Sequence, residues 1–264
     1  MTLETVLVEK QDAVGILRLN RPEKRNAMSA LLVDEAIQAL EDFDNDPAVN
    51  VVVILSTHPR VFCAGRDLDE GSVETARDII RQREIAARPP RLFLAIRSLK
   101  KVVIAGVNGF ALAGGLGLAV WCDLVVAAED AVFGLPEANV GLYPSTVLPA
   151  LGLNTASVKK CLEMILTGDR NSAAEAEKLG IVNRVVPSNR LEEATLELAK
   201  KLASKSPATL QVAKKTFYNM LNMEPAQAIT YGVEITGLLA VSADGIEGQR
   251  AFLEKREPRW QKQA

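Results

Sequence analysis

Short apolar runs that alternate with helical patterns constrain the fold of this chain more than any other feature. The runs are Val14–Leu19, Val51–Leu55, Val102–Val107, Leu124–Ala128 and Ile181–Val186. Each is too short to span a membrane, and its composition is typical of a buried strand. The alternation of such strands with helices predicts an α/β architecture.

Helical patterns lie between these strands and make up the rest of the chain after the last strand. Ser29 is expected to cap an amphipathic helix, and a second helix is predicted over Ala76–Ile96, interrupted at Pro89-Pro90. Beyond Pro187 the pattern indicates only helices, over Leu191–Leu202, Pro207–Leu221, Pro225–Leu239 and Ala243–Lys255. We therefore predict a core over residues 1–190 and a helical C-terminal region over residues 191–264.

Composition narrows the class of protein. The 264 residues are 48% hydrophobic, and charges of both signs are spread along the chain with a formal net charge of -2. This balance favours a soluble globular protein and gives no support to nucleic acid or an acidic membrane as a partner. The segment Met1–Val8 lacks the basic and apolar blocks of a signal peptide, so a cytoplasmic location is expected.

Cysteine and histidine offer little chemistry. Cys63, Cys122 and Cys161 form no short-spaced pair, and His58 is the only histidine. Neither a zinc cluster nor a disulfide framework is supported, so no metal is expected and the thiols are predicted to be buried. A Ser-His-Asp triad would have to use His58, which lies in a predicted loop, and no serine has the flanking glycines of a nucleophile elbow.

A glycine-rich loop and one carboxylate mark the candidate site. Gly109, Gly114, Gly115 and Gly117 follow the predicted strand Val102–Val107 and lead into a helical pattern. Glycines let backbone N–H groups approach a ligand closely, and a helix start offers unpaired donors that suit a developing oxyanion. Glu137 follows in Leu135-Pro136-Glu137, so the region is typical of an acyl-thioester site with a single carboxylate.

Several separated blocks together carry a family resemblance. They are Leu19–Ala27, Phe62–Leu68, Val107–Gly115, Cys122-Asp123, Phe133–Glu137, Leu166–Gly168, Gly180–Val182 and Phe252–Arg256. In this order they resemble the enoyl-CoA hydratase/isomerase family, also called the crotonase family, over nearly the whole chain. The resemblance implies a spiral of strand-strand-helix turns. It also implies C-terminal helices that pack against neighbouring subunits in a homotrimer or a dimer of trimers.

The resemblance also implies roles for individual residues. The substrate would be an acyl-CoA thioester, with coenzyme A as its handle and no separate cofactor. The backbone N–H groups of Arg66 and Gly114 would hold the thioester carbonyl, and Glu137 would be the acid/base. Substrate or coenzyme A contacts are expected at Lys24, Arg25, Ala64, Gly65, Asp67, Leu68, Gly115 and Tyr143. Lys24, Arg25 and Arg66 offer cations for phosphates, although Lys24 and Arg25 also suit solvated loop charges.

One departure from the family pattern bears on the reaction. Hydratases of this family carry two glutamates, and Gly117 stands where the first belongs, 20 residues before Glu137. With a single carboxylate, moving one proton between carbons is favoured over hydration. Three alternatives stay open: a water held by Tyr143, Ser145, Asp69 or Glu70, another enolate reaction, and a CoA-binding or assembly subunit with little catalysis. Acyl-chain specificity is not predictable from the sequence.

Overall fold

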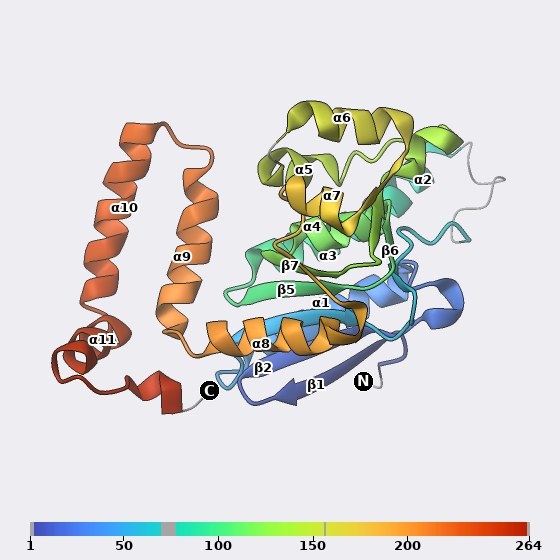
Figure 1. Cartoon of the computed structure of the whole chain (residues 1–264). Helices are drawn as coiled ribbons and strands as arrows, with labels where there is room; N and C mark the ends of the chain where they lie inside the picture. The colour runs from blue at the N-terminus through green and yellow to red at the C-terminus, as the bar shows by residue number, and fades with distance from the viewer. Residues whose placement is uncertain (1–2, 70–77, 156, 263–264) are drawn as a thin grey trace.

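The computed structural model describes residues 3–69, 78–155 and 157–262, and two sheets form its centre (Figure 1). The larger sheet has the strand order β1-β2-β3-β5-β7-β10. Its strands are β1 (Val6–Gln11), β2 (Val14–Leu19), β3 (Val51–Ser56), β5 (Val102–Val107), β7 (Leu124–Ala128) and β10 (Arg184–Val186). Only β1 runs antiparallel to its neighbour, across a tight turn in which Asp12 has a positive φ of 54°.

The second sheet is small and is built from three-residue strands. It contains β4 (Val61–Cys63), β6 (Phe110–Leu112), β8 (Val132–Gly134) and β9 (Arg170–Ser172), in that order. β4, β6 and β8 follow β3, β5 and β7 in the chain and pair in parallel. Each long strand, its short successor and the helices that follow form one turn of a spiral. The α/β spiral with a helical C-terminal region, expected from the resemblance, is thereby confirmed.

Helices cover both faces of the larger sheet. α1 (Ala30–Asn45) packs Phe43 against Gly15, and α8 (Leu191–Ala203) packs Thr195 against Gly106 on the opposite face. Ser29 caps α1 as predicted, accepting a hydrogen bond of 3.2 Å from the backbone N of Leu32. Further helices of the core are α4 (Gly114–Trp121), α5 (Leu148–Asn154), α6 (Val158–Thr167) and α7 (Ala173–Lys178).

Two elements differ from the sequence prediction. In place of one helix interrupted at Pro89-Pro90, the structure has α2 (Ile79–Ala86) and α3 (Arg88–Ser98). The prolines lie in the first turn of α3, where a missing N–H leaves no hydrogen bond unmade. Residues 76 and 77 of the predicted helix lie outside the described residues. The predicted strand Ile181–Val186 is shorter, because the N–H groups of Ile181 and Val182 both turn back to the carbonyl of Ala176.

The last three helices extend away from the sheets (Figure 1). α9 (Pro207–Met220) and α10 (Pro225–Ala240) form an antiparallel pair, and α11 (Ala243–Leu253) follows. Lys214 of α9 ties this region to the core, since its Nζ lies 2.8 Å from Asp123 Oδ2 and 2.9 Å from the carbonyl of Lys101. Asp123 thus has a structural hydrogen-bonding role. α8 is the first helix of the predicted C-terminal region, but it packs against the larger sheet of the core. The domain division at residue 190 therefore stays a prediction.

Within the described ranges, no helix combines the length and the apolar composition needed to cross a bilayer.

Candidate active site

Three segments of the candidate site leave the carboxyl ends of adjacent strands. β4, β6 and β8 are parallel neighbours, and they are followed by residues 64–68, by residues 113–117 and by residues 135–140. The carboxyl ends of parallel strands meet at one edge of a sheet, so these segments lie side by side. A hydrogen bond of 2.9 Å from Ala113 N to the carbonyl of Gly134 joins two of them directly.

The Arg66 amide is turned toward this edge by the pairing around it. Met28 N donates to the carbonyl of Gly65 at 2.7 Å, and Asp67 N donates to the carbonyl of Met28 at 3.1 Å. In a parallel pairing of this kind, the residue between the two bonded positions directs its own N–H to the opposite side. The opposite side of Arg66 is occupied by the start of α4.

The Gly114 amide faces the same small space. Gly114 is the first residue of α4, where N–H groups have no partner within the helix. A Cβ placed on Gly114 would lie 3.6 Å from Arg66 N, and one on Gly65 would lie 3.0 Å from Gly114 N. Within the described part of the chain, neither N–H donates a hydrogen bond. Two free, neighbouring backbone donors are what an oxyanion hole requires.

The glycines around these donors are required by close packing. Gly65 has a φ of 99°, which side chains rarely adopt, and a Cβ on Gly115 would lie 1.9 Å from the carbonyl oxygen of Cys63. The two donor segments therefore touch through their backbones. Gly65 and Gly115, predicted to bind substrate, bring Arg66 and Gly114 together, and Ala64 joins the early loop by donating to the carbonyl of Arg25 at 3.1 Å.

Glu137 provides a carboxyl group beside this edge. It lies in a short 3-10 helix, Pro136–Val140, directly after β8. Its Oε2 is buried and has no hydrogen-bond partner among the described residues. Burial raises the pKa of Glu137 above its ordinary value, against a smaller lowering by its own backbone N–H. A half-buried carboxyl with a raised pKa and one buried oxygen without a hydrogen-bond partner in the described structure is suited to general acid/base chemistry.

The position of the absent glutamate is filled by packing. A Cβ on Gly117 would lie 2.9 Å from Phe93 Cζ and 3.0 Å from Val147 Cγ2. Both side chains are only 1% exposed, and the Phe93 ring stacks on Trp121 with centroids 6.2 Å apart. This side of α4 is therefore an apolar wall with no room for a second carboxylate in the observed packing.

The predicted phosphate-binding cations lie at the surface. Lys24 Nζ pairs with Asp69 Oδ2 at 2.7 Å, and this hydrogen bond raises the pKa of Lys24 and lowers that of Asp69. Arg25 is exposed, with a positive φ of 53°, and Arg66 is half-buried. Asp69 is thus engaged with a cation, while Glu70, the other carboxylate considered for holding water, lies outside the described residues.

The other predicted contacts differ in accessibility. Leu68 is 63% exposed and Tyr143 is 68% exposed, and Ser145 is exposed as well. Asp67 is 5% exposed, and its carboxylate pairs with Arg21. The Asp67 side chain therefore pairs with another side chain of the protein. The roles of the other predicted site residues stay predictions.

Sequence reasoning missed the residues that support the donors. Asn26 is fully buried and ties the early loop to the strands, donating to Ser56 Oγ at 2.8 Å and accepting from Arg21 N at 2.9 Å. Met28 lies against Gly114. The only signal was the shared block Leu19–Ala27, which indicates a loop without indicating which side chains pair.

The thiols are inert in this arrangement. Cys63, Cys122 and Cys161 are free and buried, as predicted. Burial raises the pKa of Cys63 to about 12, so its thiol is not ionised near neutral pH. The described residues contain no group of three or more His, Cys, Asp or Glu side chains placed to hold a metal ion.

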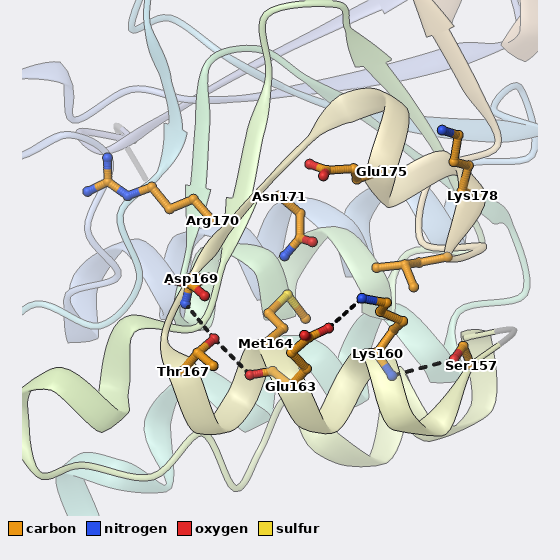
Figure 2. Close-up of a pocket in the computed structure, with 11 residues that line it drawn as sticks. Ser157, Lys160, Glu163, Met164, Thr167, Asp169, Arg170, Asn171, Glu175 and Lys178 are labelled. Atoms are coloured by element: carbon orange, nitrogen blue, oxygen red, sulfur yellow. Dashed lines mark hydrogen bonds and ion pairs between the residues drawn. The ribbon is translucent and has the colours of Figure 1, made fainter.

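A separate hollow of about 550 Å³ lies between α6, β9 and α7 (Figure 2). Its polar side chains are largely engaged with one another, since Lys160 pairs with Glu163 at 2.6 Å and Glu175 bonds the backbone N of Ser172 at 2.7 Å. None of the predicted site residues lines it. The hollow is distinct from the edge that carries Arg66, Gly114 and Glu137.

Comparisons with known proteins agree with the family resemblance of the sequence. The sequence pattern that describes the enoyl-CoA hydratase/isomerase family matches residues 9–263. The 2,3-dehydroadipyl-CoA hydratase of Escherichia coli is 34% identical over 265 residues, covering 97% of this chain and 98% of that protein. The hydroxycinnamoyl-CoA hydratase-lyase of Pseudomonas fluorescens is 34% identical over 258 residues, covering 96% and 93%.

A solved structure extends the agreement to three dimensions. Human enoyl Coenzyme A hydratase domain-containing protein 3 superposes with a TM-score of 0.92 at 33% identity, covering 97% of this chain and 100% of that one. The chain belongs to the enoyl-CoA hydratase/isomerase family and is an enzyme of that family.

Proposed function

We propose that this enzyme moves a proton within the coenzyme A thioester of an unsaturated acid and thereby shifts its double bond. The observation that carries the proposal is the half-buried Glu137, whose Oε2 has no hydrogen-bond partner among the described residues, beside two backbone N–H groups that are also without an acceptor there. The apolar packing at Gly117 supports a reaction that needs one proton-handling group.

The reaction follows from these groups. The N–H groups of Arg66 and Gly114 hold the thioester oxygen of a β,γ-unsaturated acyl-CoA, and the Glu137 carboxylate takes a proton from the α carbon. The C–H electron pair moves into the conjugated system, so negative charge gathers on the thioester oxygen, where fixed donors stabilise it. Glu137 then returns the proton to the γ carbon. The product is the α,β-unsaturated isomer, with no atom gained or lost.

Hydration is the second candidate, and two relatives that are named as hydratases favour it. The Escherichia coli and Pseudomonas fluorescens proteins are a hydratase and a hydratase-lyase. Hydration requires a group that activates water in addition to the group that protonates carbon. The pairing of Asp69 with Lys24 and the packing of Phe93 and Val147 around Gly117 weigh against such a group.

The remaining features of the proposal concern the substrate handle and the assembly. Lys24, Arg25 and Arg66 would bind the phosphates of coenzyme A, and no separate cofactor takes part. Apolar side chains exposed on the last three helices support packing against further copies in a homotrimer or a dimer of trimers; they include Phe217, Ile229, Val233, Leu238 and Phe252. A cytoplasmic location completes the proposal.

The test is product analysis by chromatography with mass detection. Purified protein is given matched pairs of β,γ- and α,β-unsaturated acyl-CoAs, beside Glu137→Gln as the background. An isomer of unchanged mass supports the proposal. A product heavier by one water establishes hydration instead, and turnover no greater than the Glu137→Gln background would leave a CoA-binding role.

A further inference from the structure

A buried ion pair lies directly behind the Arg66 amide. The guanidinium of Arg21 donates to the Asp67 carboxylate and, at 3.1 Å, to the carbonyl of Ala27. The Asp67 side chain is 5% exposed and that of Arg21 is 19% exposed. The second oxygen of Asp67 accepts from the backbone N of Asp69 at 2.9 Å, so the carboxylate is fully engaged.

This pair holds the two segments that aim the Arg66 N–H. Asp67 follows Arg66 in the chain, and its backbone N is fixed to the carbonyl of Met28 at 3.1 Å. Ala27, on the other segment, is held by the same guanidinium that holds Asp67. Both segments of the pairing are therefore held by one side chain, that of Arg21 in the early loop.

Stability alone is a poor explanation for such a pair. Burying two charges costs solvation free energy that their attraction often does not recover, and apolar residues of similar volume are frequently as stabilising. The guanidinium of Arg21 contributes something different, because its planar Nη1 group donates to both the Asp67 carboxylate and the Ala27 carbonyl and so fixes the relative orientation of the two groups.

We infer that Arg21 and Asp67 are positioning residues that hold the Arg66 N–H in line with the substrate's thioester oxygen. This inference rests on the proposed function and replaces the predicted substrate contact of Asp67 with a contact inside the protein. A backbone donor contributes to catalysis through its fixed direction, and loss of one such donor typically costs about a hundredfold to a thousandfold in turnover. Misdirecting the donor is expected to cost part of that factor, about tenfold to a hundredfold.

The test separates positioning from folding with the double variant Arg21→Met/Asp67→Leu. Apolar replacement of both partners avoids leaving one buried charge unpaired, so the variant is expected to fold. The exposed pair Arg91 and Asp34, 2.8 Å apart on the surface, supplies the matched control as Arg91→Gln/Asp34→Asn. Each is measured for thermal stability, for kcat and KM, and, combined with Glu137→Gln, for the infrared carbonyl stretch of bound crotonyl-CoA labelled with ¹³C at the thioester.

Positioning predicts that kcat falls about tenfold to a hundredfold in Arg21→Met/Asp67→Leu while KM and the melting temperature stay close to those of the parent. The carbonyl stretch, which a working oxyanion hole lowers on binding, returns toward its frequency in solution. Equal kcat and an equal carbonyl shift in this variant and the control would overturn the inference. A rise in KM without a fall in kcat would instead assign Asp67 to substrate binding and overturn its positioning role. Absence of any carbonyl shift in the parent with intact Arg21 and Asp67 would instead overturn the proposed function itself.

Discussion

The two walls of the candidate site are built in opposite ways. The donor wall, residues 64–67 with residues 113–115, is buried or half-buried throughout and is joined to the early loop and to β8 by hydrogen bonds. The base wall, residues 136–143, carries Glu137 on a short turn whose following residues, including Val140, Leu142 and Tyr143, are 49% or more exposed.

The difference reflects what each wall contributes. Backbone donors stabilise a developing charge only if they are held in place before it forms, so the donor wall must be rigid. A general acid/base must gain and lose a proton, and Oε2 of Glu137 has no partner among the described residues that would fix its charge state. Substitutions that disrupt the close backbone packing of the donor wall should therefore affect folding and activity together, whereas loss of the Glu137 carboxyl group should affect activity alone.

The largest effect is expected from Glu137→Gln. This change removes the proton-transferring group while keeping its size, so turnover should fall about a hundredfold to ten-thousandfold. Stability should be unchanged or slightly raised near pH 7, since a buried carboxylate without a partner is replaced by a neutral amide. Steady-state kinetics and thermal melting measure the two quantities.

Glu129→Gln, at an exposed carboxylate next to a strand end, is the control and should alter neither quantity. If Glu137→Gln retained full turnover, the base wall would have no role in the chemistry and the contrast between the walls would fail.

A pair of glycine substitutions compares the rigidity of the two walls. Gly115→Ala would bring a Cβ to 1.9 Å from a backbone oxygen, so we expect a loss of about 3 kcal/mol or more in the free energy of unfolding, with activity lost too. At Gly141, with a φ of 70°, an added Cβ would meet no described residue within 4 Å other than the chain neighbours, so Gly141→Ala should cost only about 1 to 2 kcal/mol and spare turnover. Urea unfolding measures the loss of stability in each variant, and activity assays measure the loss of turnover. Equal losses in the two variants would show that the walls are equally constrained.

The pH dependence of kcat/KM sharpens the picture of the base wall. Burial raises the pKa of Glu137, and the proposed reaction starts from its ionised form. Activity should therefore fall as the pH drops through that raised pKa, placing the acid limb above the ordinary glutamate value of about 4.3. An acid limb at or below the ordinary value would contradict the assignment.

The raised pKa of Glu137 also predicts the direction in which the stability of the protein changes with pH. The unfolded chain ionises Glu137 at a lower pH than the folded chain, so ionisation disfavours the folded state. The stability of the parent protein relative to Glu137→Gln should fall as the pH rises from the unfolded-state pKa to the raised folded-state pKa, and should then stay constant. Urea unfolding across this pH range measures it.

The smallest effect is expected at the mouth of the site. Lys24→Ala/Arg25→Ala removes two exposed cations, so KM for an acyl-CoA should rise about twofold to tenfold with turnover unchanged. Lys10→Ala, at an exposed lysine paired with Asp46 at 2.7 Å, is the control. An unchanged KM would assign Lys24 and Arg25 to solvated loop charges.

The sequence predicted the long buried strands well because continuous apolar runs such as Val102–Val107 carry a strong signal. The three-residue strands β4, β6, β8 and β9 are too short to show a period, so the second sheet was not predicted as such. The break between α2 and α3 was misplaced because prolines suit a helix start as well as an interruption.

The site was predictable where backbone chemistry leaves a local mark. The glycines around the start of α4 and the lone Glu137 indicated donors and a base from neighbouring residues alone. The partners of Asp67 and Gly117 were not predictable: Arg21 lies 46 residues from Asp67, and Phe93 comes from α3 while Val147 comes from the turn before α5. Such contacts depend on how distant elements meet, which no local pattern records.

The pairing of Arg66 with Met28 has a consequence for how this site can change over evolution. Because the donor at position 66 is a main-chain group, almost any codon preserves it, and only proline deletes it. In the proposed function, the side chain at position 66 can change with the coenzyme A handle that it would bind, while the backbone N–H that would contact the thioester oxygen is kept. On this proposal, the residue type at position 66 reflects which ligand is bound. The catalytic function is preserved by the backbone path and by the glycines that permit it.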